Sequence, residues 1–354
     1  MLSPLSDIEK IKKLDKQNML SSIEMLPRQI EQVLSDFTKI RFPRWKNISN
    51  IVVCGMGGST LGSHIIKTAH FEELKTSMEI VNNYSLPGWT DKNTLCVISS
   101  YSGNTEEPLS CLEEAEQKTR MIFAMASGGQ LGEAIKNKSI NGYLFNPEFN
   151  PCGEPRMGLG YSLFSQIMLF KNLNIINVHE KKIDKIPTIL KKIINDFGIT
   201  NSNNNSAKII AENLRGCIPI IIASDFLQGS AHAFNNQINE NAKTFAAYFA
   251  IPEINHHLME SLRFPKGKNA LKFVLIKSKF YHKKNRLRYE ITEKILKNNK
   301  IKYISYECAE QDKLTQILEI LALGSFAGFY MSMLNRIDPT PIPNVDYFKM
   351  EMAK

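Results

Sequence analysis

Residues 94–118, TLCVISSYSGNTEEPLSCLEEAEQK, decide the fold class of this chain. The apolar run TLCVIS (94–99) predicts a buried strand, and the polar segment from about Glu106 to Lys118 predicts a helix. A turn of small, hydroxyl-bearing residues joins the two. A strand that passes through a short turn into a helix is the repeating unit of an α/β domain with a mainly parallel sheet.

Similar units lie on both sides of this stretch. The runs IVVCG, MEIVNNY and MIFAMA predict further strands at 51–55, 78–84 and 121–126, and later strands are expected at 217–224 and around residues 244, 272 and 302. Helical segments separate most of these runs. We therefore expect an α/β protein with two domains, each a mainly parallel sheet flanked by helices.

The chain length of 354 residues agrees with two or three domains at about 150 residues each. The polar stretch NSNNNSAK (201–208) is the candidate linker. The expected division is N-terminal helices and a first domain over 1–200, and a second domain with a Pro-rich C-terminal tail over 209–354. The apolar segment 320–334 is shorter than the roughly 20 residues of a membrane span, so a buried helix and no membrane partner are expected.

The chain carries a formal charge of +9, from 44 Lys and Arg against 35 Asp and Glu. Part of this excess lies in the run KSKFYHKKNRLR (277–288), which is typical of a solvated surface. No sequence signature of a nucleic-acid-binding domain accompanies it, so no nucleic-acid partner is predicted. The six widely spaced cysteines favour free thiols and a cytoplasmic location, and no cluster of metal ligands has recognisable spacing.

Two turns carry the strongest indication of ligand binding. GMGGS (55–59) follows the first predicted strand, and SSYSGNT (99–105) follows the strand at 94–99. Glycines allow a ligand to approach the backbone, and hydroxyls beside a helix N-terminus suit a phosphoryl group. Both turns are expected at the carboxyl ends of neighbouring strands, where ligands bind in such sheets. The simpler alternatives are a tight structural turn and a helix cap.

These two turns together resemble the sugar isomerase (SIS) domain, which holds phosphosugars. Four later segments narrow the resemblance: NPCGEPRMGLGYSL (150–163), NQINENAKTFA (236–246), PEINHHLMESL (252–262) and DPTPIPNVDYFK (338–349). With them, nearly the whole chain is similar to the bifunctional phosphoglucose/phosphomannose isomerase family. The resemblance implies two SIS domains, a homodimer, no cofactor, and interconversion of glucose 6-phosphate or mannose 6-phosphate with fructose 6-phosphate.

The resemblance also implies the roles of individual residues. In this family the matching positions act as the catalytic base, the ring-opening residue, a fixed cation and a C-terminal lysine, which here are Glu240, His256, Arg156 and Lys349. The phosphate and the sugar are expected on the two turns, at Gly55, Gly57, Gly58, Ser59, Ser100, Ser102 and Thr105.

The residue types suit the chemistry without the family. Moving a carbonyl between two sugar carbons needs a base, and a buried carboxylate such as Glu240 has its pKa raised toward neutrality. A cation such as Arg156 stabilises the negative charge of an enediolate. A histidine that titrates near neutrality, such as His256, suits the opening of the sugar ring. This mechanism requires neither a metal nor a redox cofactor.

Other interpretations stay open at this point. Glu240 could equally be a surface carboxylate at a helix end, and Arg156 could be part of a structural ion pair. His257 is an alternative to His256 as the ring-opening residue. A protein that senses a sugar phosphate without catalysis would use the same cradle. An isomerase for an amino sugar or a pentose phosphate is a further alternative, and a basic nucleic-acid binder is a third.

Overall fold

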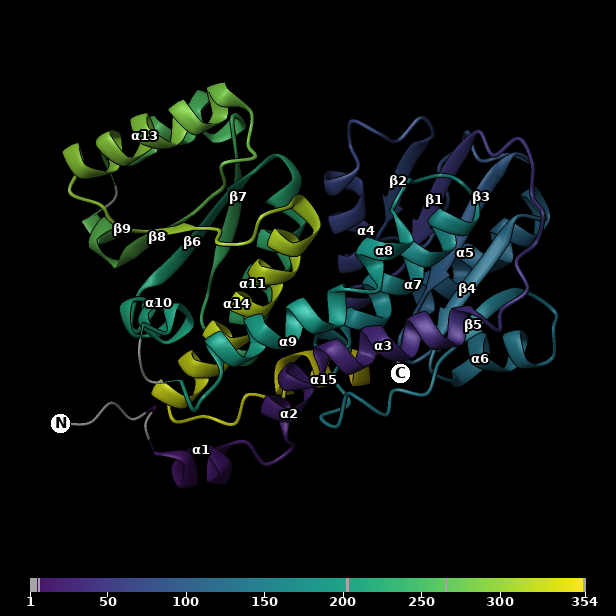
Figure 1. Ribbon diagram of the computed structural model, residues 1–354, viewed down its shortest axis with the longest axis horizontal. Coiled ribbons are helices and arrows are strands. Elements are labelled where there is room, and N and C mark those ends of the chain that lie inside the picture. The colour runs from purple at the N-terminus through teal and green to yellow at the C-terminus, as the bar shows by residue number, and fades with distance from the viewer. Residues whose placement is uncertain (1–4, 6, 202–203, 265, 353–354) are drawn as a thin grey trace.

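The computed structural model describes residue 5 and residues 7–201, 204–264 and 266–352. It contains two parallel sheets that lie side by side, with helices α11 (Gln228–Ala242) and α14 (Lys313–Leu334) between them (Figure 1). The expected fold class, two α/β domains with parallel sheets flanked by helices, is confirmed.

The first sheet has the strand order β2-β1-β3-β4-β5, and every neighbouring pair is parallel. Its strands are β1 (Asn50–Cys54), β2 (Ser77–Val81), β3 (Thr94–Ser99), β4 (Ile122–Ala126) and β5 (Asn141–Leu144). Its crossover helices are α4 (Gly58–Ala69), α5 (Glu106–Lys118) and α6 (Gly129–Lys136). β3 is buried at all its positions, in agreement with the apolar run that predicted it. Only β5, a short edge strand with exposed residues, was not expected.

The second sheet has the order β7-β6-β8-β9 and is also parallel. Its strands are β6 (Ile218–Ser224), β7 (Ala247–Ile251), β8 (Leu271–Lys277) and β9 (Lys302–Glu307), and helix α13 (Lys283–Asn298) joins the last two. Short helices η3 (Asp225–Leu227), η4 (Glu253–His256), α12 (Leu258–Ser261) and η5 (Lys266–Ala270) lie in its loops. The order repeats that of β2-β1-β3-β4, so β8 occupies the position in this sheet that β3 has in the first.

Further helices lie before the first sheet and between the two sheets in the chain. They are α1 (Ile8–Leu14), α2 (Met19–Glu24), α3 (Leu26–Phe37), η2 (Pro155–Met157), α7 (Leu159–Asn172), α8 (Glu180–Ile183), α9 (Ile186–Phe197) and α10 (Ser206–Leu214). Of the expected linker 201–208, residues 202–203 lie outside the described residues. Its last residues open α10, where the side chain of Asn205 accepts a hydrogen bond of 3.1 Å from the amide of Lys208.

Helix α14 contains the apolar segment that was expected to form a buried helix. Asp312 caps its N-terminus by accepting bonds from the amides of Leu314 and Thr315, at 3.0 and 3.2 Å. The helix is long and apolar enough to cross a membrane, yet every residue from Thr315 to Leu334 is buried inside the molecule. It packs against helices on several sides, which explains why it lacks a polar face.

The Pro-rich tail forms a helix that the sequence analysis did not anticipate. Helix α15 (Pro343–Met352) begins at a proline, which suits the first helical position because its ring fixes φ and needs no amide partner. No described side chain of α15 is buried, and Tyr347 and Phe348 are more than 60% exposed. The helix therefore presents aromatic groups on the surface next to Lys349.

Candidate active site

The hydroxyl-rich turn after β3 forms a compact loop at the start of helix α5. Ser100 is buried, and its hydroxyl lies 2.8 Å from that of Thr105 and accepts a bond of 3.1 Å from the amide of Gly103. Ser102 is exposed, and its hydroxyl accepts a bond of 3.3 Å from the amide of Asn104. Three hydroxyls thus surround the N-terminus of α5, whose dipole favours an anion.

Gly103 is required by the geometry of this loop. Its φ is +75°, a conformation that L side chains rarely adopt. A Cβ atom there would lie 1.8 Å from the carbonyl oxygen of Gly128 at the start of α6. The loop is therefore held against the next strand-to-helix turn, and its shape depends on a residue without a side chain.

The glycine-rich turn after β1 lies directly beside this loop. Ser59 accepts a bond of 3.0 Å at its hydroxyl from the amide of Tyr101, and its carbonyl accepts one of 2.8 Å from the Ser99 hydroxyl. A Cβ atom on Gly55 would lie 2.4 Å from the carbonyl oxygen of Ser99, whereas Gly57 is exposed with a φ of +50°. The two turns meet at the carboxyl edge of the sheet because β1 and β3 are neighbours.

Gly58 connects this edge to a buried arginine. A Cβ atom on Gly58 would lie 2.8 Å from the carbonyl oxygen of Pro155 and 2.9 Å from the amide nitrogen of Arg156. The side chain of Arg156 is only 2% exposed and donates to Asn241 Oδ1 at 2.7 Å and to the carbonyl of Thr340 at 2.7 Å. These bonds fix the guanidinium between the two halves of the molecule.

Two carboxylates share the guanidinium of Arg156. Glu154 accepts a short hydrogen bond from Nη1, and Glu240 Oε2 lies 3.5 Å from the same nitrogen. Burial raises the pKa of Glu240, and the positive charges of Arg156, Lys243 and Lys349 oppose this rise. Glu240 is thus a half-buried carboxylate, its side chain 32% exposed, beside a fixed cation, which suits a proton acceptor.

Lys243 ends helix α11 beside Glu240, in a left-handed conformation with φ of +50°. Its ammonium group donates to the carbonyl of Pro339 at 2.9 Å and to the carbonyl of Glu240. Burial, together with the Arg156 charge, lowers the pKa of Lys243 to about 8. Lys349 on α15 is exposed but close enough for its charge to lower the pKa of Glu240.

His256 lies apart from this cluster. The amide side chain of Asn239, next to Glu240, pairs with both backbone groups of Ala246 at 3.0 and 3.1 Å, which places Glu240 near the start of β7. His256 follows the end of that five-residue strand and is exposed. At about 3.3 Å per residue the strand alone spans about 13 Å. Glu240 and His256 of one chain therefore lie at opposite edges of the second sheet.

Four polar residues around Arg156 were missed as site candidates by the sequence analysis. They are Glu154, Asn241, Lys243 and Thr340, and all four stand inside segments that resemble the isomerase family. The side-chain atoms Asn241 Nδ2 and Thr340 Oγ1 are buried and make no hydrogen bond to any described group. Their proximity to a buried cation is a signal that only the folded chain provides.

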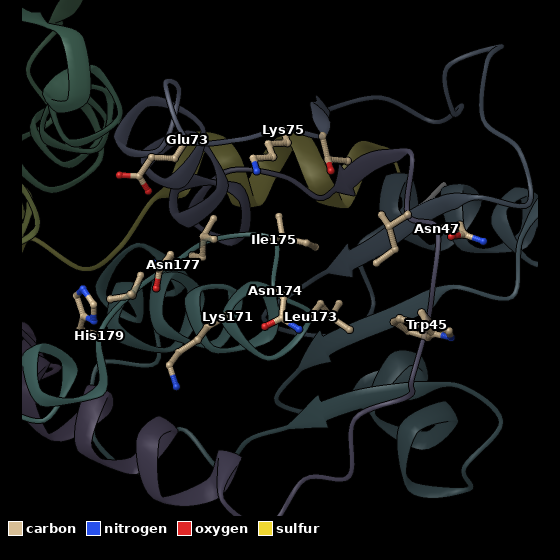
Figure 2. A pocket seen from close by; sticks show the side chains of 14 residues that line it. Trp45, Asn47, Glu73, Lys75, Lys171, Leu173, Asn174, Ile175, Asn177 and His179 are labelled. Carbon is tan, nitrogen blue, oxygen red and sulfur yellow. The ribbon is translucent and has the colours of Figure 1, made fainter.

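A cavity of about 950 Å³ contains none of these site residues. It is lined by Trp45, Lys75, Lys171 and His179 among others, and Figure 2 shows their side chains around an open hollow. Its lining segments precede β1 and β2 or follow α7, so it lies at the amino edge of the first sheet. Ligands of open α/β sheets bind at the carboxyl edge. The large volume of this cavity therefore does not make it the active site.

Both halves of the molecule have the sugar isomerase fold. Residues 203–352 match the model of the bacterial phospho-glucose isomerase C-terminal SIS domain. A crystal structure of a hypothetical protein from Thermus thermophilus superposes with a TM-score of 0.70 at 14% identity, covering 98% of this chain and 93% of that one. The class is thus a protein of two SIS domains.

Curated relatives resemble the chain over most of its length. The bifunctional phosphoglucose/phosphomannose isomerase of Caldicellulosiruptor bescii is 28% identical over 341 residues, which cover 95% of this chain and 99% of the relative. The protein of the same name from Aquifex aeolicus is 29% identical, covering 86% and 90%. The chain is therefore a relative of the bifunctional phosphoglucose/phosphomannose isomerases over nearly its whole length, and the resemblance read from its motifs is confirmed.

Proposed function

We propose that the protein is an aldose–ketose isomerase that interconverts glucose 6-phosphate and mannose 6-phosphate with fructose 6-phosphate. The observation that carries this proposal is the pairing of Glu240 with Arg156. A carboxylate with a raised pKa lies 3.5 Å from a buried guanidinium, and Gly58, in the turn beside the hydroxyl-rich loop, packs against the backbone of Arg156. A protein that only sensed a sugar phosphate would have no use for such a base.

The proposed reaction begins with the phosphate on the loop around Ser100, Ser102 and Thr105. Glu240 removes the proton from C2 of the open-chain aldose, and the electron pair forms a C1–C2 double bond. The carbonyl oxygen at C1 gains the negative charge, which Arg156 stabilises. The oxygen at C1 takes up a proton, the hydroxyl at C2 loses one, and Glu240 returns its proton to C1 to give the ketose.

Because C2 is planar in the enediolate, the two C2 epimers of the aldose give the same intermediate. This accounts for action on both glucose 6-phosphate and mannose 6-phosphate by one set of residues.

We infer that ring opening uses His256 of the partner subunit in a homodimer. Support comes from the distance between Glu240 and His256 within one chain, and from the surface of α15. Its exposed Tyr347, Phe348 and Met350 flank Lys349 and offer an apolar contact for a second copy. A site shared by two copies would bring base and ring-opening residue together.

The proposed function is tested with purified protein in the presence of EDTA. Glucose 6-phosphate and mannose 6-phosphate are supplied separately, and fructose 6-phosphate is detected. We expect turnover of both, and a loss of roughly 1,000-fold or more in kcat for Glu240→Gln, in line with removal of a general base of an enzyme. Glu253→Gln, an exposed carboxylate paired with His257 at 2.6 Å, is the matched control.

Each other outcome distinguishes a competing function. Turnover of only one aldose would retain the mechanism and remove the dual specificity. Binding of fructose 6-phosphate without turnover would replace the isomerase with a sensor. Undiminished turnover in Glu240→Gln would reject this residue as the base.

A further inference from the structure

Arg156 uses almost all of its hydrogen-bonding capacity inside the protein. A guanidinium carries five N–H groups. Four of them have acceptors in the chain, which are Asn241 Oδ1 at 2.7 Å, the carbonyls of Thr340 at 2.7 Å and Pro339 at 3.3 Å, and a carboxylate oxygen of Glu154. The second N–H of Nη1 is therefore the group that is left to act on Glu240 or on a ligand.

The two carboxylates that face Nη1 are not equivalent. Glu154 Oε2 accepts a hydrogen bond from this nitrogen, whereas Glu240 Oε2 lies 3.5 Å from it. A charge-assisted hydrogen bond between a guanidinium nitrogen and a carboxylate is about 2.7–2.9 Å long. Glu240 thus stands off the guanidinium without a close ion pair. A carboxylate in a close ion pair would be a weaker base, because the cation stabilises its charged form.

Glu154 is tied to the hydroxyl-rich loop through its backbone. The side-chain amide of Asn150, which is 3% exposed, donates to the hydroxyl of Tyr101 at 2.8 Å and to the carbonyl of Glu154 at 2.9 Å. The same carbonyl accepts a bond of 2.9 Å from the amide of Met157 in η2. Tyr101 belongs to the hydroxyl-rich loop, so one buried side chain connects that loop to Glu154.

The charges that act on Glu240 come from four segments of the chain. Burial raises the pKa of Glu240 most, and the negative charge of Glu154 adds to this rise. Arg156 on η2, Lys243 at the end of α11 and Lys349 on α15 lower the pKa. Among these charged groups Glu154 is the carboxylate, and it faces the same guanidinium nitrogen as Glu240. It therefore offsets the cation that favours the charged form of the base.

We propose that Glu154 is a positioning residue of the isomerase, which takes a hydrogen bond from Arg156 Nη1 and thereby keeps Glu240 free to accept the substrate proton. This role rests on the proposed function, in which Glu240 is the base. Without the charge of Glu154, the guanidinium closes on Glu240 and the base becomes a weaker proton acceptor. Glu154 itself exchanges no proton with the substrate in this role.

The dependence of kcat on pH in Glu154→Gln tests this role, with fructose 6-phosphate formed from glucose 6-phosphate as the assay. Removal of the negative charge lowers the pKa of the base, so the acid limb should move to lower pH by about half a pH unit or more. The plateau of kcat should fall about tenfold, because a weaker base transfers the proton more slowly. Glu154→Asp keeps the charge and should keep the limb near its wild-type position. Glu148→Gln, which neutralises an exposed carboxylate of the same segment, is the control and should match wild type.

A second measurement follows Glu240 without any turnover. NMR of protein labelled at the glutamate carboxyl carbons records the titration of Glu240, whose signal is the one missing from Glu240→Gln. The midpoint of this titration should be lower in Glu154→Gln than in wild type. If wild type converts neither aldose, the proposed function fails, whereas the NMR titration still decides whether Glu154 acts on Glu240.

Three results would overturn the role of Glu154. The first is an acid limb and an NMR midpoint that stay unchanged in Glu154→Gln. The second is a loss of kcat as large as that of Glu240→Gln, which would make Glu154 itself the base. The third is a fall in kcat that is equal at every pH and comes with a lower melting temperature, which would leave Glu154 a purely structural residue.

Discussion

At the scale of single residues, opposed effects set the ionisation of Glu240: burial and the charge of Glu154 raise its pKa, and Arg156, Lys243 and Lys349 lower it. Burial disfavours its charged form, whereas Arg156, 3.5 Å away and itself 2% exposed, favours it. Burial outweighs the attraction, so the pKa of Glu240 is raised. The acid limb of the proposed isomerase activity should therefore lie at a higher pH than an ordinary glutamate would give.

Substitution of Arg156 separates its charge from its geometry. Arg156→Gln removes the charge that lowers the pKa of Glu240, so the acid limb of kcat should move to higher pH. Arg156→Lys keeps a cation but loses the guanidinium N–H groups that donate to Asn241 and Thr340, so kcat should fall about 100-fold. The acid limb of its kcat–pH profile should stay nearly unchanged, because the positive charge remains. The measurement is kcat against pH for the three proteins. Identical limbs in all three would show that Arg156 does not act on the base.

The lowered pKa of Lys243 predicts how the free energy of unfolding depends on pH. Its pKa is lowered from 10.5 to about 8 in the folded chain. Between these two pH values the unfolded chain binds more protons at this residue, so its contribution to the free energy of unfolding increases with pH. Below pH 8 both states are protonated, and the cost of the partly desolvated charge is constant.

We therefore expect the difference in unfolding free energy between wild type and Lys243→Met to change from pH 8 to 10.5, with wild type gaining. Urea unfolding at several pH values measures it, and Lys294→Met, an exposed lysine on α13, is the control. Parallel curves for wild type and Lys243→Met would contradict the lowered pKa.

At the scale of elements, the two phosphate-side turns and η2 form one packed unit. Gly58 is the first residue of α4 and touches the backbone of Pro155 and Arg156. Gly58→Ala would place a Cβ atom 2.8 Å from Pro155 and so displace the segment that holds Arg156. We expect kcat to fall more than tenfold, since small displacements of catalytic groups are costly.

The control for this prediction is Gly88→Ala, where a Cβ atom meets no atom within 4 Å. That variant should retain full kcat. Circular dichroism and a melting curve show whether Gly58→Ala remains folded. A folded Gly58→Ala protein with wild-type kcat would exclude the coupling of α4 to Arg156.

The elements were largely predictable because local patterns determine them. The bounds of β3 and α5 were expected at the residues where they occur, since an apolar run, a turn and a helix follow in order. β5 was missed because an exposed edge strand of four residues has no apolar run. Local sequence patterns could not predict that Glu154, Asn241 and Thr340 gather around Arg156. This grouping depends on segments up to 186 residues apart in the chain (from 154 to 340).

At the scale of the whole molecule, the proposed active site is incomplete within one chain. Arg156, Glu240 and Lys349 lie together, but His256 lies beyond the far end of β7. The helices between the sheets pack tightly: a Cβ atom on Gly229 of α11 would lie 2.5 Å from Ile65 of α4. Glu240 on α11 and His256 after β7 both belong to the second half, so a movement of one half against the other would not bring them together. In the proposed homodimer, His256 would come from the second copy.

Mixing two inactive variants distinguishes these possibilities. Glu240→Gln and His256→Ala are each expected to lose most of the isomerase activity. In a dimer with shared sites, half of the molecules in an equal mixture are mixed dimers, and one of their two sites is intact. Unfolding and refolding the mixture should therefore restore about a quarter of wild-type activity. Recovery should fail with Glu240→Gln combined with Arg156→Gln, because both residues belong to the same site. No recovery in the first mixture would mean that base and ring-opening residue come from the same chain.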